Sequence, residues 1–341
     1  MGDMRAAVFH ESGPAASVLQ LTERRLPRVG AGEVRVRIVL SAVNPTDTGT
    51  RAGRGVPDGI DPPRVPNQDG TGVVDALGEG VGGLEPGDRV WVWDAAYRRA
   101  DGTAQEYVTL PRHQVVRMND DIPIEVGAAL GIPALTAHRC LTVASDGPDR
   151  LAPGALAGRT VLVAGGAGAV GNAAIQLAKW AGATVLTTVS SKEKAELATA
   201  AGADAVIDYR EEDVAARIRE LSATGPQVIV EVSTGNLDLD LDVVAPGGNI
   251  AIYVAGKFSM PSFKAMLKNV SLDFVLTYTT TPEEKANAVA AVAEAVNAGA
   301  FRVGEDAGLP LHRFPLERIA EAHEAVENNA VGKVVIEVTT L

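Results

Sequence analysis

The feature that most constrains this chain is a glycine-rich turn, AGGAGAVG at residues 164–171. The run TVLVA before it, at 160–164, is typical of a buried strand, and the segment AVGNAAIQLAKWAG that overlaps its end has helical spacing. The turn contains Gly166, Gly168 and Gly171 in the pattern G-x-G-x-x-G. Glycines at these places let the backbone approach a pyrophosphate, which then lies at the N-terminus of the helix. Because the turn joins a strand to a helix, it predicts a dinucleotide site.

Two kinds of pattern divide the chain. The first third is rich in short strands, such as the alternating run EVRVRIVL at residues 33–40, and frequent Gly and Pro turns suggest a barrel or sandwich. After about residue 135, short β-branched runs alternate with helical segments. This alternation predicts an α/β fold with a doubly wound parallel sheet.

Composition narrows the class of protein. The chain of 341 residues is long enough for two domains, and its net charge of -12 argues against nucleic acid, because phosphate binding needs clustered Lys and Arg. No apolar run approaches a membrane span and no signal-peptide pattern is present, so we expect a cytoplasmic protein without membrane contact. The single cysteine, Cys140, excludes a disulfide within the chain and is expected to be a buried structural thiol.

The stretch VLTTVSSKEK at residues 185–194 addresses the choice of cofactor. An acidic residue is expected near the end of this strand, where it accepts hydrogen bonds from the adenosine ribose and would repel a 2′-phosphate. Val189 holds that place and can do neither. Groups able to receive a 2′-phosphate follow it in the loop and after the next strand: Ser190, Ser191, Lys194, Tyr209 and Arg210. The pattern therefore favours NADPH.

A purely structural interpretation of the same loop stays open. Ser190 and Glu193 fit the S-x-x-E capping box, so the serine could serve only to cap a helix. Lys192 and Lys194 could be solvated helix lysines. A cap and a phosphate contact are compatible, because both use the helix N-terminus.

Taken together, the motifs resemble the medium-chain dehydrogenase/reductase superfamily, and specifically its zinc-free quinone oxidoreductase (zeta-crystallin-like) branch. The resemblance runs along nearly the whole chain and includes SAVNPTDTGTRAG, DGTGVV, LEPGDRVW, AGGAGAVGNAAIQLAKWAGA, AGADAVIDYREED and GKVVIEV. It implies a GroES-like β-rich catalytic domain formed by residues 1–135 and 279–341, and a Rossmann NADP-binding domain formed by residues 136–278. It also implies an active site in the cleft between these domains, and a homodimer. The apolar segment SLDFVLTY could be an edge strand for such a dimer or an internal strand.

The chain departs from the zinc alcohol dehydrogenases of this superfamily at the metal. Asn44 stands where those enzymes have a first zinc cysteine, and Gln68 and Asp69 stand in place of His-Glu. The third ligand position falls near Ile132, and no four-cysteine lobe exists. Zinc needs three or four Cys, His or carboxylate ligands, so we expect no bound metal and no alcohol oxidation by that route.

The resemblance implies a role for particular residues. Asn44 would lie beside the nicotinamide and the substrate oxygen as the catalytic residue, although it could equally be a satisfied turn residue before Pro45. Asp47 is expected to be structural. The expected cofactor-binding residues are Asn44, Thr136, Gly166, Ala167, Gly168, Ala169, Val170, Gly171, Ser190, Ser191, Lys194, Tyr209, Tyr253 and Lys333.

The expected reaction is hydride transfer from NADPH to a quinone or similar conjugated carbonyl compound. Without a metal, such an acceptor is favoured because it delocalises the incoming negative charge itself. Some relatives have a tyrosine soon after this Asn as a candidate proton donor, and NPTDTGTRAGRGVPDG has none. Two alternatives stay open: an NADPH-dependent enoyl or alkenal reductase, and a non-catalytic NADPH-binding protein.

Overall fold

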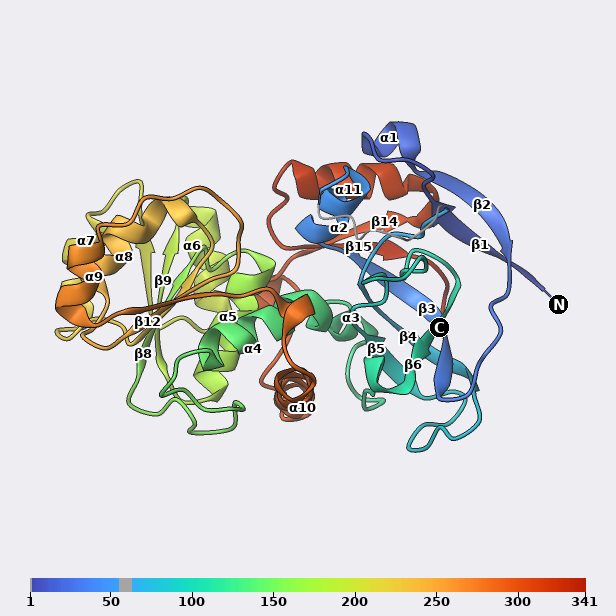
Figure 1. Cartoon of the computed structure of the whole chain (residues 1–341), viewed down its shortest axis with the longest axis horizontal. Coiled ribbons are helices and arrows are strands. Elements are labelled where there is room, and N and C mark those ends of the chain that lie inside the picture. The colour runs from blue at the N-terminus through green and yellow to red at the C-terminus, as the bar shows by residue number, and fades with distance from the viewer. Residues whose placement is uncertain (1, 55–62) are drawn as a thin grey trace. The chain divides into compact units, whose positions relative to one another are not determined.

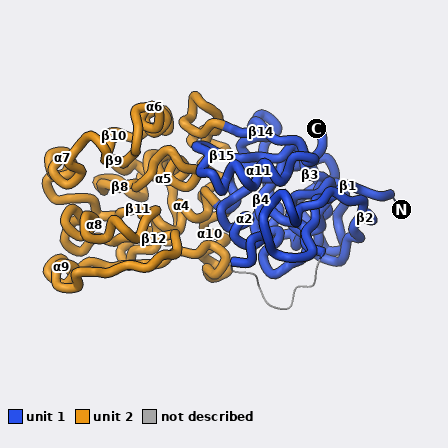
Figure 2. Tube along the Cα trace, turned by 90° about the horizontal axis from the view of Figure 1, so that it is seen from above, with its two compact units in different colours: residues 1–132, 311–341 blue, residues 133–310 orange. Residues whose placement is uncertain are grey.

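The computed structural model describes residues 2–54 and 63–341 of the chain. It has two compact units, residues 1–132 with 311–341, and residues 133–310 (Figure 2). Each unit is described by itself below.

The first unit is built on an antiparallel sheet that receives its last strands from the C-terminal end of the chain. In the described part of the chain the order is β14-β15-β3-β4-β5-β7, with β6 also paired to β3 and only the β14–β15 pair parallel. A separate hairpin pairs β1 with β2. The strands are β1 (Asp3–Val8), β2 (Gln20–Arg25), β3 (Glu33–Val43), β4 (Asp69–Leu77), β5 (Arg89–Val92), β6 (Tyr107–Pro111), β7 (Val115–Arg117), β14 (Leu311–Pro315) and β15 (Lys333–Glu337).

Alternation along β3 builds the core of this unit. Val34, Val36 and Ile38 are fully buried, while the charged residues between them are partly exposed, as the period of two requires. Short helices cover the sheet and its turns: α1 (Ala15–Val18), η1 (Arg112–Gln114), α2 (Pro45–Arg51), α3 (Ile124–Gly127), η2 (Leu130–Ala134), η6 (Leu316–Arg318) and α11 (Ile319–Glu327). The β-rich fold predicted for the first third of the chain is therefore confirmed.

The second unit contains a parallel sheet in the order β10-β9-β8-β11-β12-β13. Its strands are β8 (Thr160–Ala164), β9 (Thr184–Val189), β10 (Ala205–Asp208), β11 (Val228–Glu231), β12 (Asn249–Ile252) and β13 (Ser271–Phe274). All neighbouring strands run parallel, which confirms the predicted doubly wound sheet. The strand order reverses direction between β8 and β11, the place where ligands bind in open α/β sheets.

Helices flank this parallel sheet on both faces (Figure 1). They are α4 (Leu135–Thr142), α5 (Ala169–Trp180), α6 (Lys192–Ala200), α7 (Val214–Leu221), η3 (Thr234–Asn236), α8 (Leu237–Val243), α9 (Ser262–Lys268), η4 (Thr277–Thr279), α10 (Pro282–Asn297) and η5 (Glu305–Ala307). Cys140 lies fully buried within α4, and burial raises the pKa of its thiol, so the predicted structural thiol is confirmed. Within the described residues, no helix combines the length and apolar character needed to span a membrane.

Residues 279–310 belong to the second compact unit, whereas the sequence assigned them to the catalytic domain. The physical reason is that α10 packs against α4 and α5. Loop residues after α10 are also tied to α5, because the Gln176 side chain bonds both the N–H and the C=O of Arg302. The domain boundaries at 135 and 278 stay a prediction.

Candidate functional site

The glycine turn lies between β8 and α5, as its pattern predicts. Gly166 and Gly171 are needed for close packing, because a Cβ at Gly166 would lie 2.2 Å from Thr187 Oγ1 and one at Gly171 would lie 2.3 Å from Gly165 O. Gly168 is the N-cap of α5 and is exposed, and the nearest atom to a Cβ there would be 3.5 Å away. The turn thus combines a tight backbone with an open approach at Gly168.

The groups that this turn can offer a ligand are backbone N–H groups. The first N–H groups of a helix have no acceptor within the helix and carry its positive dipole end. In α5 these N–H groups belong to the residues from Ala169 onward, whereas the N–H of the N-cap residue Gly168 donates to Gly165 O at 3.0 Å. The arrangement suits an anionic group such as a pyrophosphate.

The loop after β9 forms a small cluster of polar side chains. Lys194 Nζ donates to Ser190 Oγ at 2.9 Å, and Ser191 Oγ accepts from the backbone N–H of Lys194 at 3.3 Å. The N-cap of α6 is therefore Ser191, so the predicted Ser190–Glu193 capping box is wrong by one residue. Either serine is a good N-cap residue by type. Because helix α6 begins at Lys192, the N-cap position falls on Ser191. The Ser190 hydroxyl is free of capping and lies beside an ammonium group.

The next parallel strand brings Tyr209 to the same edge of the sheet. Asp208 at the end of β10 pairs in register with Val189, and the Tyr209 N–H donates to Val189 O at 3.0 Å. The Tyr209 side chain is exposed, whereas the Val189 side chain is buried. The structure therefore brings Ser190, Lys194 and Tyr209 together near one strand end.

Thr136 and Tyr253 occupy different elements of this unit. Thr136 lies buried in α4, and Tyr253 follows β12 directly, with its N–H donating to Glu231 O at 3.3 Å. Burial raises the pKa of the Tyr253 phenol, and the neighbouring Cys140 and Glu231 raise it further. Tyr253 thus stands at the carboxyl edge of the sheet as a neutral hydroxyl.

A buried polar cluster in the first unit contains the residues that the resemblance places at the zinc positions. Asn44 is the N-cap of α2, Asp69 begins β4, and Ile132 lies in η2. Asp69 Oδ2 accepts hydrogen bonds from Asn44 Nδ2 and from the Ile132 N–H, both at 2.9 Å. Asp47 Oδ2 accepts from the Asn44 N–H at 2.7 Å, which is the structural role expected for Asp47. Two positions far from Asp69 in the sequence therefore converge on its carboxylate.

Lys333 supplies the positive charge of this cluster. Its Nζ donates to Asn44 Oδ1 and to Val43 O, and lies 3.9 Å from Asp69 Oδ2. Register explains the approach, because Val334 of β15 pairs with Val43 of β3. Lys333 was expected from the sequence as a cofactor ligand, but its contact with Asn44 was not foreseen. The only sequence signal is a lysine beside an apolar strand.

Burial dominates the electrostatics of the cluster. It raises the pKa of Asp69 to about 6 against the opposing effect of Lys333, and it raises the pKa of Asp47, with a further increase from Asp69. Burial also lowers the pKa of Lys333, which the two carboxylates oppose. The Lys333 ammonium is thus the positive charge that interacts with both the Asp47 and the Asp69 carboxyl groups.

The donor set does not fit a zinc ion. Asp69 is a suitable ligand, but Asn44 presents an amide, Ile132 presents a backbone N–H, and Gln68 Oε1 accepts from the Ala96 N–H at 3.0 Å. An ammonium already lies beside the carboxylate. Within residues 2–54 and 63–341, no three His, Cys, Asp or Glu side chains are grouped as metal ligands. Zinc needs three or four such ligands.

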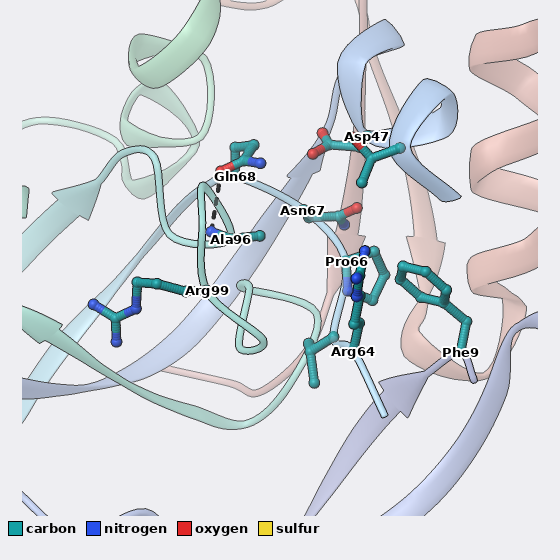
Figure 3. Close-up of a pocket in the computed structure, with 10 residues that line it drawn as sticks. Phe9, Asp47, Arg64, Pro66, Asn67, Gln68, Ala96 and Arg99 are labelled. Carbon is teal, nitrogen blue, oxygen red and sulfur yellow. Dashed lines mark hydrogen bonds between the residues drawn. The ribbon is translucent and has the colours of Figure 1, made fainter. Parts of the chain in front are cut away.

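A small cavity lies beside this cluster, between Gln68 and Arg99 (Figure 3). Its volume of about 20 Å³ has room for about one water molecule and none for a quinone ring. The cavity beside the cluster is therefore too small to be the substrate pocket. The segment without a tyrosine, NPTDTGTRAGRGVPDG, starts at Asn44 and continues into residues 55–59, which lie outside the described residues.

A second buried acidic pair was missed from the sequence. Glu231 ends β11 and Asp240 lies in α8, and both are 1% exposed. Burial, together with the charge of and hydrogen bond to the neighbouring Glu231, raises the pKa of Asp240 to about 9, so the two carboxyl groups share a proton near neutral pH. The run LDLDLD gives no indication that one of its acids is buried.

Two protein-family models match the chain. Residues 30–120 match the alcohol dehydrogenase GroES-like domain, and residues 169–294 match the zinc-binding dehydrogenase family. These segments lie in the first and second unit, respectively. The GroES-like and Rossmann parts expected from the sequence are thereby confirmed.

Individual proteins match over almost the full length. The chain is 30% identical to the quinone oxidoreductase of Lama guanicoe over 98% of this chain and 97% of the relative. It is 28% identical to the NADPH-dependent alkenal/one oxidoreductase of Arabidopsis thaliana, over 98% of this chain and 79% of the relative. Among solved structures, a mycobacterial protein in complex with NADPH has 31% identity and a TM-score of 0.80, over 98% of this chain and 99% of that one.

Proposed function

The chain belongs to the quinone oxidoreductase branch of the medium-chain dehydrogenase/reductase superfamily, and we propose that this oxidoreductase transfers hydride from NADPH to quinones or similar conjugated carbonyl compounds. The observation that carries the proposal is the Asn44–Asp69–Lys333 cluster. It fills the position of a metal site with groups that cannot activate an alcohol as a Lewis acid. The relatives named quinone oxidoreductase support the same reaction class.

NADPH is the proposed cofactor, and when bound it supplies the hydride. The exposed Gly168 and the N-terminus of α5 would hold its pyrophosphate. Ser190, Lys194 and Tyr209 would hold the 2′-phosphate, because a hydroxyl and an ammonium already face each other there and Val189 carries no opposing charge. Thr136, Tyr253, Asn44 and Ser191 are proposed to contact the remaining parts of the cofactor.

The products follow from the chemistry of the acceptor. A quinone that receives two electrons as hydride becomes a hydroquinone anion, whose negative charge is delocalised over the ring. It takes its proton from water, so no positioned acid is required from the chain. An enone, by contrast, gives an enolate that benefits more from a positioned acid. For this reason the quinone is placed first and the alkenal second.

The alkenal alternative is favoured by one specific observation, the similarity to the Arabidopsis alkenal/one oxidoreductase. Tyr253 is a neutral hydroxyl at the carboxyl edge of β12 and would be its candidate acid. A non-catalytic NADPH-binding protein is a third possibility, in which cofactor binding would occur without turnover. We further propose that the protein is a cytoplasmic homodimer that holds no zinc. Its substrate is a small molecule, and it does not bind nucleic acid.

The test measures NADPH oxidation with a panel of ortho- and para-quinones, enones and enoyl thioesters. Simple alcohols are tested in the opposite direction, as NADP⁺ reduction. We expect the quinones to be the fastest substrates and the alcohols to be unreactive. Treatment with a chelator should leave the rate unchanged. Elemental analysis should find much less than one zinc ion per chain. Turnover only with alcohols, or loss of activity with the metal, would show that the reaction has been assigned wrongly.

A further inference from the structure

The turn that follows β11 lies at the switch point of the parallel sheet. The chain leaves β11 through Val232 and enters η3 next to the end of β8, the place where ligands of open α/β sheets bind. The Val232 side chain packs on the glycine turn, because a Cβ at Gly165 would lie 3.1 Å from Val232 Cγ1. Val232 is nevertheless 38% exposed. The turn therefore presents apolar surface directly beside the proposed position of the pyrophosphate.

One buried carboxylate holds this turn in its conformation. Glu231 Oε1 accepts hydrogen bonds from the Ser233 N–H at 2.5 Å and from Asn236 Nδ2 at 3.1 Å. The Ser233 hydroxyl in turn accepts from the Gly235 N–H at 3.2 Å, which caps η3. The conformation of residues 232–236 therefore depends on the Glu231 side chain.

The other end of the turn is tied to the loop after β12. Thr234 Oγ1 donates to Lys257 O at 3.3 Å, and a Cβ at Gly256 would lie 2.4 Å from that hydroxyl. The Tyr253 N–H, at the start of the same loop, donates to Glu231 O at 3.3 Å. The loops after β11 and β12 thus hold each other at the carboxyl edge of the sheet, so a displacement of one would move the other.

The burial of Glu231 has no explanation in an ion pair. Among the described residues no Lys or Arg side chain pairs with it, and its neighbour Asp240 is another acid that hydrogen-bonds it. A buried carboxylate without a cationic partner is destabilising unless its oxygens accept hydrogen bonds. Because an ionised carboxylate only accepts, the proton shared with Asp240 leaves Glu231 Oε1 as the acceptor for the turn.

We propose that Glu231 is a positioning residue for NADPH. By holding the Ser233 N–H and the Asn236 amide, it keeps Val232 against the glycine turn as an apolar wall beside the pyrophosphate. The inference rests on the proposed NADPH function and deepens it, because it gives a role in cofactor affinity to a buried residue that does not touch the cofactor. Asp240 acts through Glu231, and Glu231 acts through Val232.

The experiment measures the NADPH Kd of the full chain by fluorescence titration without substrate. Val232→Ala removes part of the apolar wall and Asn236→Ala removes one donor to Glu231, so each should raise the Kd roughly three- to tenfold. The double variant should lose less than the product of the two losses, because both changes act on the same contact.

Asn249→Ala is the matched control in the neighbouring strand. It also removes an amide that donates to a carboxylate, Asp273 Oδ2 at 2.6 Å, but it lies at the start of β12 and thus at the opposite edge of the sheet from the switch point. It should lower the Tm and leave the NADPH Kd unchanged. Loss of stability is thereby separated from loss of the turn.

Variants of Glu231 itself separate position from charge. Glu231→Gln keeps an oxygen that accepts from both donors, so its Kd should stay within about twofold of the wild type. Glu231→Ala removes the acceptor and should raise the Kd on the order of tenfold. Where Glu231→Ala does not fold, Asn236→Ala carries the test, because Asn236 is partly exposed.

Three outcomes would overturn the inference. The first is a Glu231→Gln variant as weak as Glu231→Ala, which would mean that the charge matters and not the position. The second is a pair of losses in Val232→Ala and Asn236→Ala that multiply in the double variant. The third is an Asn236→Ala variant that weakens NADPH no more than Asn249→Ala does. Failure of the wild type to bind NADPH is a different result, because it would contradict the proposed function itself.

Discussion

At the scale of single residues, Lys194 is the side chain that should separate NADPH from NADH in the proposed site. If it receives the 2′-phosphate together with Ser190, Lys194→Ala removes a charged hydrogen bond worth roughly 1.5–3 kcal/mol. At about 1.4 kcal/mol per tenfold, the NADPH Kd should rise on the order of ten- to a hundredfold. Solvent screening favours the lower end of that range. NADH affinity should barely change.

The reciprocal variant is Val189→Asp, at the position where other dinucleotide sites carry an acid. Its carboxylate should recruit NADH through the ribose hydroxyls and repel NADPH. Titration of both cofactors against both variants decides the matter. Equal losses of NADH and NADPH in Lys194→Ala would assign the lysine to folding of α6 alone, together with the Ser191 cap.

At the scale of elements, the proton shared between β11 and α8 makes stability depend on pH. The pKa of Asp240 is raised to about 9 in the fold from an ordinary 3.8, so the folded chain holds a proton that the unfolded chain releases. This contribution is fully present below about pH 4 and is lost as pH rises toward 9, by at most about 1.4 kcal/mol per pH unit. Between pH 5 and 9 this contribution by itself lowers the free energy of unfolding of the wild type.

Asp240→Asn tests this directly, because the amide keeps a donor toward Glu231 without titrating. The difference in Tm between the variant and the wild type should therefore shift in favour of the variant as pH rises. The comparison cancels the contributions of Asp47 and Asp69, whose pKa values burial also raises. Parallel Tm curves for the two proteins would show that Asp240 does not titrate as described.

Local signals explain which elements could be predicted from the sequence. The glycine turn was placed correctly because strand, turn and helix signals follow one another within a dozen residues or so. The cap of α6 was misplaced by one residue because Ser190 and Ser191 are both good N-caps and only the end of β9 decides between them. A local sequence pattern therefore predicts that a helix or strand exists, but it locates the terminal residue only to within one or two positions.

Contacts between distant segments explain what the sequence could not supply. Lys333 meets Asn44 only through the pairing of β15 with β3, and that register cannot be read from either strand alone. Glu231 and Asp240 meet because α8 folds back beside β11. Residues 279–310 lie in the second compact unit although the resemblance implied the catalytic domain, because the spacing of an amphipathic helix does not determine which core it packs against.

At the scale of the whole molecule, the exposed edge of the parallel sheet is the surface that bears on assembly. Within the described residues β13 pairs only with β12, so SLDFVLTY contains an edge strand rather than an internal one. The segment around it exposes large apolar side chains: Phe258, Met260, Phe263, Met266, Leu267, Phe274 and Leu276. Phe258 and Phe274 stack with ring centres 5.6 Å apart. Such a patch beside an open strand edge is unusual for a monomer.

The proposed homodimer would cover this patch by pairing β13 of two copies. A lysine on the edge strand opposes such pairing, so Phe274→Lys should convert a dimer into a chain of 35.3 kDa, measured by light scattering after size exclusion. Leu21→Lys, on the exposed face of β2, is the matched control and should stay dimeric. NADPH binding should survive in the monomer, because the proposed phosphate contacts lie at β8, β9 and α6, on the other side of the strand order from β13. A dimer that persists in Phe274→Lys would place the interface elsewhere and leave the apolar segment 258–276 to another partner.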